Sequence, residues 1–215
     1  MYNDFWINNV LIPLSGIFWI ATYLLIIKRG FQDRTYGMPL AALCANFSWE
    51  ILFGFIYPDM YPMNIVNQAW CIMDVLIVYQ YLKYGLTDYP KNLSIKWHIP
   101  VFIISFFIAF GIVFFMYHEL KDYEGAYSAW GMNLVASILF ITMLLRRNNI
   151  SGQSIYIGIF KLLGTFFMDI AQYRLTPENN LLTFLYFSIL IFDLAYIALY
   201  YKKAKEQGIN PWMRI

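Results

Sequence analysis

Seven apolar runs, each near the ~20 residues that an α-helix needs to cross a bilayer, divide this sequence from end to end. Short connections that carry glycine or proline separate them, as is usual between helices. The runs occupy residues 10–27, 38–57, 66–83, 97–117, 126–145, 154–173 and 181–201. We therefore expect an all-α membrane protein in which residues 1–215 form one domain of seven transmembrane helices.

The composition agrees with a membrane protein. Of the 215 residues, 60% are hydrophobic and 13% are charged, which is about half the charged share of a soluble domain. The net charge of +2 is too small to indicate nucleic acid binding, so the expected partner is the lipid bilayer. Two cysteines and two histidines exclude a disulfide scaffold and a standard zinc site.

The basic residues predict the orientation of the bundle. In membrane proteins, Lys and Arg concentrate in the cytoplasmic loops. Twelve of the 15 basic residues fall on one side of the predicted spans: Lys28, Arg29, Arg34, Lys83, Lys91, Lys96, Arg146, Arg147, Lys202, Lys203, Lys205 and Arg214. This asymmetry predicts an outer or lumenal N-terminus and a cytoplasmic C-terminus.

Five ionisable residues fall inside the apolar runs: Glu50, Asp74, Lys161, Asp169 and Asp193. A charge at mid-bilayer costs about 2.5–3.5 kcal/mol even on the lenient insertion scale, so such residues are functional candidates. Glu50, Asp74 and Asp193 lie within roughly 5 Å of one depth, counted at 1.5 Å per residue. The alternative is a structural role: Lys161 and Asp169, two turns apart on one helix face, form an ion pair, and Asp74 hydrogen-bonds Asn or Trp neighbours on other helices.

The acids share helix faces with aromatic and amide side chains. These companions are Asn46 and Trp49 in the second run, Trp70 in the third, Trp130, Asn133 and Ser137 in the fifth, Thr165 in the sixth, and Tyr186, Tyr196 and Tyr200 in the seventh. The pattern predicts a chamber walled by aromatic rings into which carboxyl and amide groups reach. The alternative is that Tyr and Trp only anchor the helices at the membrane interfaces.

One segment resembles a known family. Arg34–Leu40 (RTYGMPL), the 46–50 stretch NFSWE, and the Tyr57–Pro58 pair are similar to the small integral membrane terpene cyclases of fungal meroterpenoid and indole-diterpene pathways. Their bacterial relatives act on prenylated indoles. Further agreement comes from Leu43, Cys44, Gly54, Trp70, Asp74, Tyr79, Trp130, Asp193 and Tyr196. The short chain favours a bacterial member in the cell membrane; a fungal one is expected in the endoplasmic reticulum membrane.

The resemblance implies a site with two acids, Glu50 and Asp193, that starts cyclisation without a metal or another cofactor. A carboxyl group in an apolar medium favours its neutral form and can act as a general acid. The expected substrate is a lipophilic prenylated aromatic or indole compound, protonated at its terminal epoxide or alkene. Asp74 then orients Glu50 or takes the last proton.

The aromatic rings have a role in the same reaction. A cation that migrates along the prenyl chain is stabilised over an aromatic face by about 2 kcal/mol or more when desolvated. The residues expected to support the reaction in this way are Trp49, Trp70, Trp130, Tyr186 and Tyr196, with Asn46 beside the acids. The segment around Asp169 matches no pattern of the family, so its role stays open.

Two other functions compete with cyclisation. A proton-coupled transporter or proton relay needs polar residues between the mid-plane and both surfaces, and the apolar stretch Pro39–Leu43 disfavours such a path. A retinal pigment needs a lysine deep in the last helix. Lys202 comes only at the end of that helix, and Asp193 occupies the depth that the lysine would need.

Overall fold

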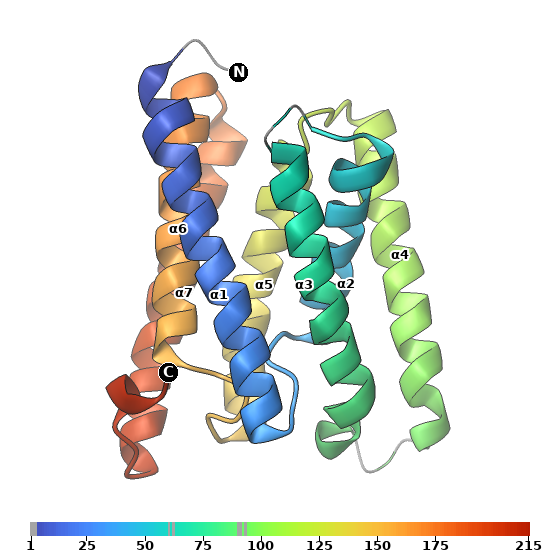
Figure 1. Ribbon diagram of the computed structural model, residues 1–215, viewed down its shortest axis with the longest axis vertical. Helices are drawn as coiled ribbons and strands as arrows, with labels where there is room; N and C mark the ends of the chain where they lie inside the picture. Colours follow the sequence, from blue (N-terminus) through green and yellow to red (C-terminus); the bar gives the residue numbers. More distant parts are fainter. Residues whose placement is uncertain (1–3, 60, 62, 90–91, 93) are drawn as a thin grey trace.

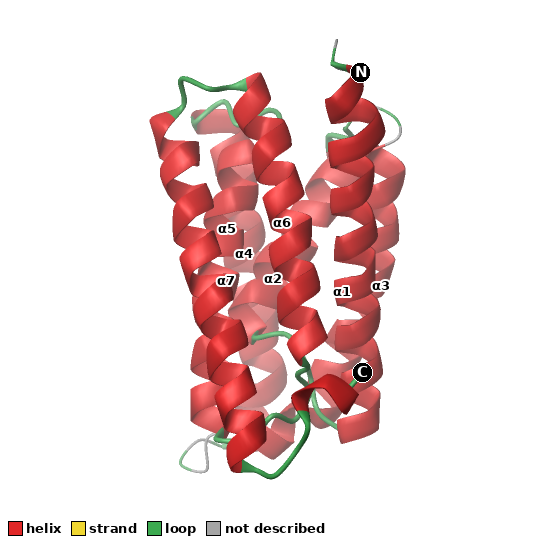
Figure 2. Cartoon of the chain, turned by 90° about the vertical axis from the view of Figure 1, so that its left-hand side faces the viewer, coloured by secondary structure: helices red, strands yellow, loops and turns green. Residues whose placement is uncertain are grey.

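The computed structural model describes residues 4–59, 61, 63–89, 92 and 94–215, and within these ranges it contains helices and no strands (Figures 1 and 2). The α-helices are α1 (Ile12–Asp33), α2 (Leu40–Ile51), α3 (Met63–Tyr84), α4 (His98–Glu119), α5 (Ala126–Arg147), α6 (Ile155–Leu175) and α7 (Asn180–Glu206). Two π-helical turns extend the bundle: η1 (Ile7–Leu11) precedes α1, and η2 (Leu52–Ile56) continues α2.

Each predicted apolar run falls on one of these helices. Six of the helices are long and apolar enough to cross a membrane. The remaining one, Leu40–Ile56, is apolar but shorter. It is shorter than the predicted run because Pro39 stands at the N-cap of α2 and the helix begins only after it.

The helices form two groups, with α1, α6 and α7 on one side and α2, α3 and α4 on the other (Figure 1). Helix α5 lies between them and packs against both α7 and α2. Small residues allow the close approaches within the first group: a Cβ added at Gly164 of α6 would lie 2.8 Å from the Trp19 ring of α1. Helix α4 is peripheral, since only His98 and Val113 of its residues are buried.

The connections at one end of the bundle are held by ion pairs. Asp33, at the end of α1, pairs with Arg29 at 2.5 Å and with Arg214 of the C-terminal segment. Arg147, at the end of α5, pairs with Asp88 at 2.5 Å. The basic ends of α1, α3, α5 and α7 lie at this same end (Figure 1). Lys91, which the sequence assigns to the cytoplasmic side, lies outside the described residues.

Candidate functional site

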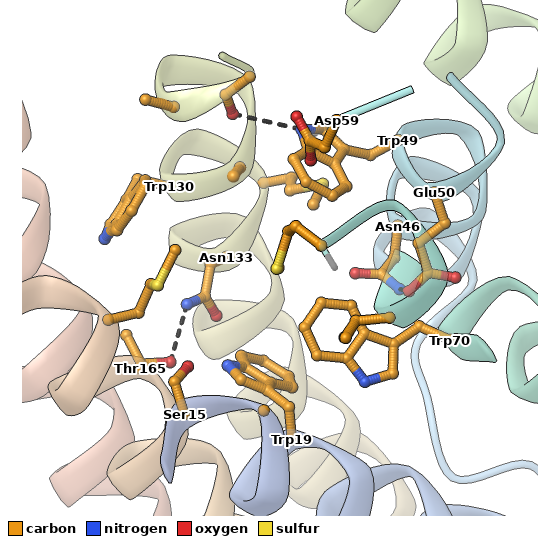
Figure 3. A pocket seen from close by; sticks show the side chains of 18 of the residues that line it. Ser15, Trp19, Asn46, Trp49, Glu50, Asp59, Trp70, Trp130, Asn133 and Thr165 are labelled. Atoms are coloured by element: carbon orange, nitrogen blue, oxygen red, sulfur yellow. Dashed lines mark hydrogen bonds between the residues drawn. The ribbon is translucent and has the colours of Figure 1, made fainter. Parts of the chain in front are cut away.

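A cavity of about 890 Å³ lies between the two groups of helices, and residues of α1, α2, α3, α5 and α6 line it (Figure 3). At one end it reaches the exposed side chains Tyr61 and Tyr123, which are 76% and 57% exposed. Towards the middle of the bundle it reaches Glu50 and Lys161, which are buried. We call this cavity the chamber. It confirms the predicted common space for the aromatic and polar faces of α2, α3, α5 and α6, whereas no residue of α7 lines it.

Glu50 projects from α2 into a network of hydrogen bonds with α1 and α3. Its Oε1 accepts hydrogen bonds from the Tyr23 hydroxyl and from the Asn46 side-chain amide, the latter at 2.8 Å. The same Asn46 nitrogen donates to Asp74 Oδ2 at 2.9 Å. Glu50 and Asp74 are 2% and 0% exposed. Asn46 is four residues before Glu50, so the helical repeat alone places these two side chains together.

The two carboxyl groups of this network lack a cationic partner in the part of the chain that the structure describes. No ion pair among the described residues includes Glu50 or Asp74. Two neighbouring carboxylates that share one amide donor repel each other, which favours one proton held between them. Glu50 Oε2 and Asp74 Oδ1 accept no hydrogen bond from the described part of the chain. One of these free oxygens is the natural place for that proton.

Asp193 has a different environment. Its Oδ1 and Oδ2 accept hydrogen bonds from Lys161 Nζ at 2.8 and 3.0 Å, and the same ammonium donates to the Ser137 hydroxyl at 2.7 Å. Both members of the ion pair are buried. Lys161 lines the chamber, whereas Asp193 does not. The structure therefore brings Glu50, Asp74 and Asn46 together and leaves Asp193 in a separate cluster.

Comparison with known proteins agrees with this architecture. A family model described as Pyr4-like transmembrane terpene cyclases matches residues 2–207. The chain belongs to this family. It is therefore an integral membrane protein and a terpene cyclase. No solved structure matches the chain.

Three relatives of this cyclase come from fungi. The Pyr4-family terpene cyclase mfmH of Annulohypoxylon moriforme is 28% identical over 94% of this chain and 88% of its own length. The terpene cyclase macJ of Penicillium terrestre is 30% identical over 71% of this chain and 61% of its own. The terpene cyclase atmB of Aspergillus flavus is 26% identical over 95% of this chain and 90% of its own length. The resemblance stated from the helix-two motif is thus confirmed.

The expected pairing of Lys161 with Asp169 is wrong. Asp169 Oδ1 instead accepts a hydrogen bond from the Trp130 indole at 2.6 Å. Two turns of one helix separate residues by roughly 12 Å along its axis, whereas α7 packs directly against α6 and brings Asp193 to Lys161.

The aromatic residues expected around the chamber divide into two sets. Trp49, Trp70 and Trp130 line it. Tyr186 and Tyr196 do not: Tyr186 packs behind Trp130 with ring centroids 5.4 Å apart, and the Tyr196 hydroxyl donates to Gln153 at 3.2 Å. A helix face identified from sequence includes side chains one layer behind a cavity, so the pattern predicted burial correctly but not contact with the chamber.

Helix α1 contributes residues that the sequence analysis missed. Tyr23 binds Glu50 and stacks on Trp70 with ring centroids 6.4 Å apart and planes at 7°. Trp19 also lines the chamber. Ser15, Trp19, Thr22 and Tyr23 recur at the spacing of a helix face, and all four line the chamber. This stripe in the first run was the signal that would have identified them.

The mouth of the chamber carries a further acid outside the helices. Asp59 Oδ2 accepts a hydrogen bond from the Asn67 side chain at 2.8 Å. Burial raises the pKa of Asp59 to about 6, and the nearby charge of Glu124 acts in the same direction while the Asn67 hydrogen bond opposes it. As for metals, no three His, Cys, Asp or Glu side chains of the described ranges gather as a ligand set would.

Proposed function

We propose that this cyclase protonates a prenylated aromatic or indole substrate at its terminal epoxide or alkene and guides the resulting cation into rings. Such a reaction belongs to meroterpenoid or indole-terpenoid biosynthesis. The observation that carries the proposal is Glu50: it lines an apolar chamber, and within the described ranges it forms no ion pair and its Oε2 accepts no hydrogen bond from a neutral donor.

We also propose that residues 1–215 form one domain that crosses the membrane seven times. The shorter helix Leu40–Ile56 spans about 25 Å at 1.5 Å per residue, close to the ~30 Å hydrocarbon thickness of a bilayer. The basic ends of α1, α3, α5 and α7 support a cytoplasmic C-terminus and an outer or lumenal N-terminus. In this orientation the mouth of the chamber faces outward.

The first step transfers the Glu50 proton to the substrate. With an epoxide, the proton goes to the oxygen, one C–O bond breaks, and a hydroxyl and a carbocation result. With an alkene, the proton adds to one carbon and leaves the charge on the other. In both cases Glu50 becomes a carboxylate, and the Tyr23 hydroxyl and the Asn46 amide stabilise it through the hydrogen bonds that they already make to Oε1. These donors are in place before the reaction, so they cost no reorganisation.

The cation then migrates between aromatic rings. Trp19, Trp49, Trp70 and Trp130 line the chamber, and their faces stabilise positive charge in an apolar space. Loss of a proton ends the cyclisation. That proton goes to the Glu50 carboxylate and so restores the acid, while Asp74, which shares the Asn46 amide with Glu50, orients that carboxylate.

Asp193 has a supporting role in this proposal. Its carboxylate is neutralised by Lys161, and an aspartate in an ion pair is a poor proton donor. Together with Ser137, the ion pair links α5, α6 and α7 and so holds the wall of the chamber that faces Glu50. Loss of either partner is therefore expected to reduce product formation through the shape of the chamber.

The transporter alternative requires a polar path through the cytoplasmic half of the bundle. Below the chamber, Leu43, Ile77 and Leu144 are fully buried in one apolar cluster. Packed apolar side chains of this kind leave little room for a chain of water molecules that would carry a proton. Proton flux into liposomes that contain the purified protein is expected to equal that of empty liposomes.

The test of the proposed function uses Glu50→Gln, which keeps the size of the side chain and its acceptor oxygen. Purified protein in lipid nanodiscs is given prenylated indoles and quinols, each with and without a terminal epoxide, and the products are identified by mass spectrometry. We expect Glu50→Gln to lose roughly 10²–10⁴-fold in turnover, the usual contribution of a general acid. Glu124→Gln, the same change at the exposed mouth of the chamber, should retain wild-type turnover. Wild-type turnover by Glu50→Gln would refute the role of Glu50.

A further inference from the structure

The wall of the chamber opposite Glu50 carries a second group of polar side chains. Asn133 of α5 and Thr165 of α6 both line the chamber, and the Asn133 amide donates to the Thr165 hydroxyl at 3.0 Å. Figure 3 shows this pair on one side of the pocket, with Glu50, Asn46 and Trp70 on the other. The chamber thus has polar groups on two facing walls, with aromatic residues between them.

The oxygen of Asn133 is left without a donor. Asn133 Oδ1 is buried and accepts no hydrogen bond from the residues that the structure describes. A buried acceptor without a donor destabilises the folded protein, so its presence in a chamber wall indicates a site for a ligand. Its hydrogen bond to Thr165 fixes the plane of the amide, which holds this oxygen in one direction.

The nearby lysine does not donate a hydrogen bond to Asn133 Oδ1. Lys161, four residues before Thr165 on α6, also lines the chamber. An ammonium group has three hydrogens, and those of Lys161 are directed at Ser137 Oγ and at both oxygens of Asp193. Asn133 Oδ1 is therefore an acceptor in this wall that Lys161 leaves without a donor.

The rest of the wall defines the kind of ligand. Trp19, Met132, Ala136 and Met168 line the chamber together with the Asn133–Thr165 pair, so the ligand is apolar except for a hydrogen-bond donor at one place. We propose that Asn133, oriented by Thr165, binds the O–H or N–H donor on the aromatic head group of the substrate. This inference rests on the proposed function. It places the head group on α5 and α6 and the terminal prenyl unit beside Glu50, and so makes Asn133 a determinant of specificity.

The test measures binding, so that it does not depend on turnover. In the Glu50→Gln background, quenching of tryptophan fluorescence in nanodiscs gives the Kd of a prenylated phenol or indole and of its O-methyl or N-methyl counterpart. We expect methylation of the donor to weaken binding by roughly tenfold, the effect of one hydrogen bond. With Asn133→Leu added, the two ligands should bind equally, each near the affinity of the methylated one.

Two further variants complete the experiment. Thr142→Val, at an exposed position of α5, should retain the tenfold preference for the unmethylated ligand. If Asn133→Leu does not fold, Thr165→Val is used in its place. It should reduce the preference for the unmethylated ligand to threefold or less, because the Asn133 amide is then free to turn. A preference that persists in these variants, or equal binding of both ligands by the parent protein, would overturn the inference. If the protein binds neither ligand, both this inference and the proposed substrate class are overturned. If the Glu50→Gln enzyme is active and still prefers the unmethylated ligand, only the role of Glu50 is overturned.

Discussion

Removal of a single hydroxyl tests whether Glu50 is assisted as an acid. Tyr23→Phe deletes the group that donates to Glu50 Oε1 and keeps the ring that stacks on Trp70. A hydrogen bond to a charged group contributes about 1.5–3 kcal/mol. This bond is strongest when Glu50 has given up its proton. Loss of the bond therefore raises the barrier of proton transfer from Glu50 to the substrate. At 1.36 kcal/mol per factor of ten, kcat should fall roughly 10- to 150-fold.

Steady-state kinetics in nanodiscs separates this effect from a structural one. Because Tyr23 does not provide the proton itself, KM should stay within about twofold of the wild-type value. The alkene substrate should lose more rate than its epoxide counterpart, because transfer to a weaker base leaves more charge on Glu50 in the transition state. The melting temperature should change little. Wild-type kcat, or an equal loss for both substrates accompanied by a large fall in melting temperature, would refute the reasoning.

The remaining predictions concern stability. Lys161→Met leaves the Asp193 carboxylate buried without its cation and should cost about 3–5 kcal/mol in thermal unfolding; the same loss from Lys161→Met in an Asp193→Asn background would contradict this. The pKa of Asp59 is raised to about 6, so the folded protein binds this proton more tightly than the unfolded chain. Its stabilising effect is therefore present below the unfolded pKa near 4 and is lost as the pH rises through about 6, and Asp59→Asn should flatten the melting temperature over this range. Gly125 has φ of 65°, and a Cβ there would lie 2.9 Å from Trp49 Nε1, so Gly125→Ala should lower the melting temperature and alter the fluorescence of Trp49.

Much of the site was predictable because helical periodicity is local. The spacing of Asn46 and Glu50 places their side chains together whatever the rest of the chain does, and the structure has that hydrogen bond at 2.8 Å. Asp74 lies at the depth expected from its run and joins the same network. Tyr23 was missed because a tyrosine in an apolar run carries no charge to mark it, although its neighbours on the helix face gave a signal.

The apolar runs predicted the helices and their approximate limits, and the helical repeat predicted which side chains are buried, since both depend only on neighbours along the chain. Which of those side chains meet follows from the packing of the helices. Lys161 pairs with Asp193 and not with Asp169 because α7 lies against α6. Glu50 lines the chamber while Asp193 stands outside its lining. Contacts between helices depend on the rotation and depth of each helix in the bundle, and these are fixed by the packing of all the helices together.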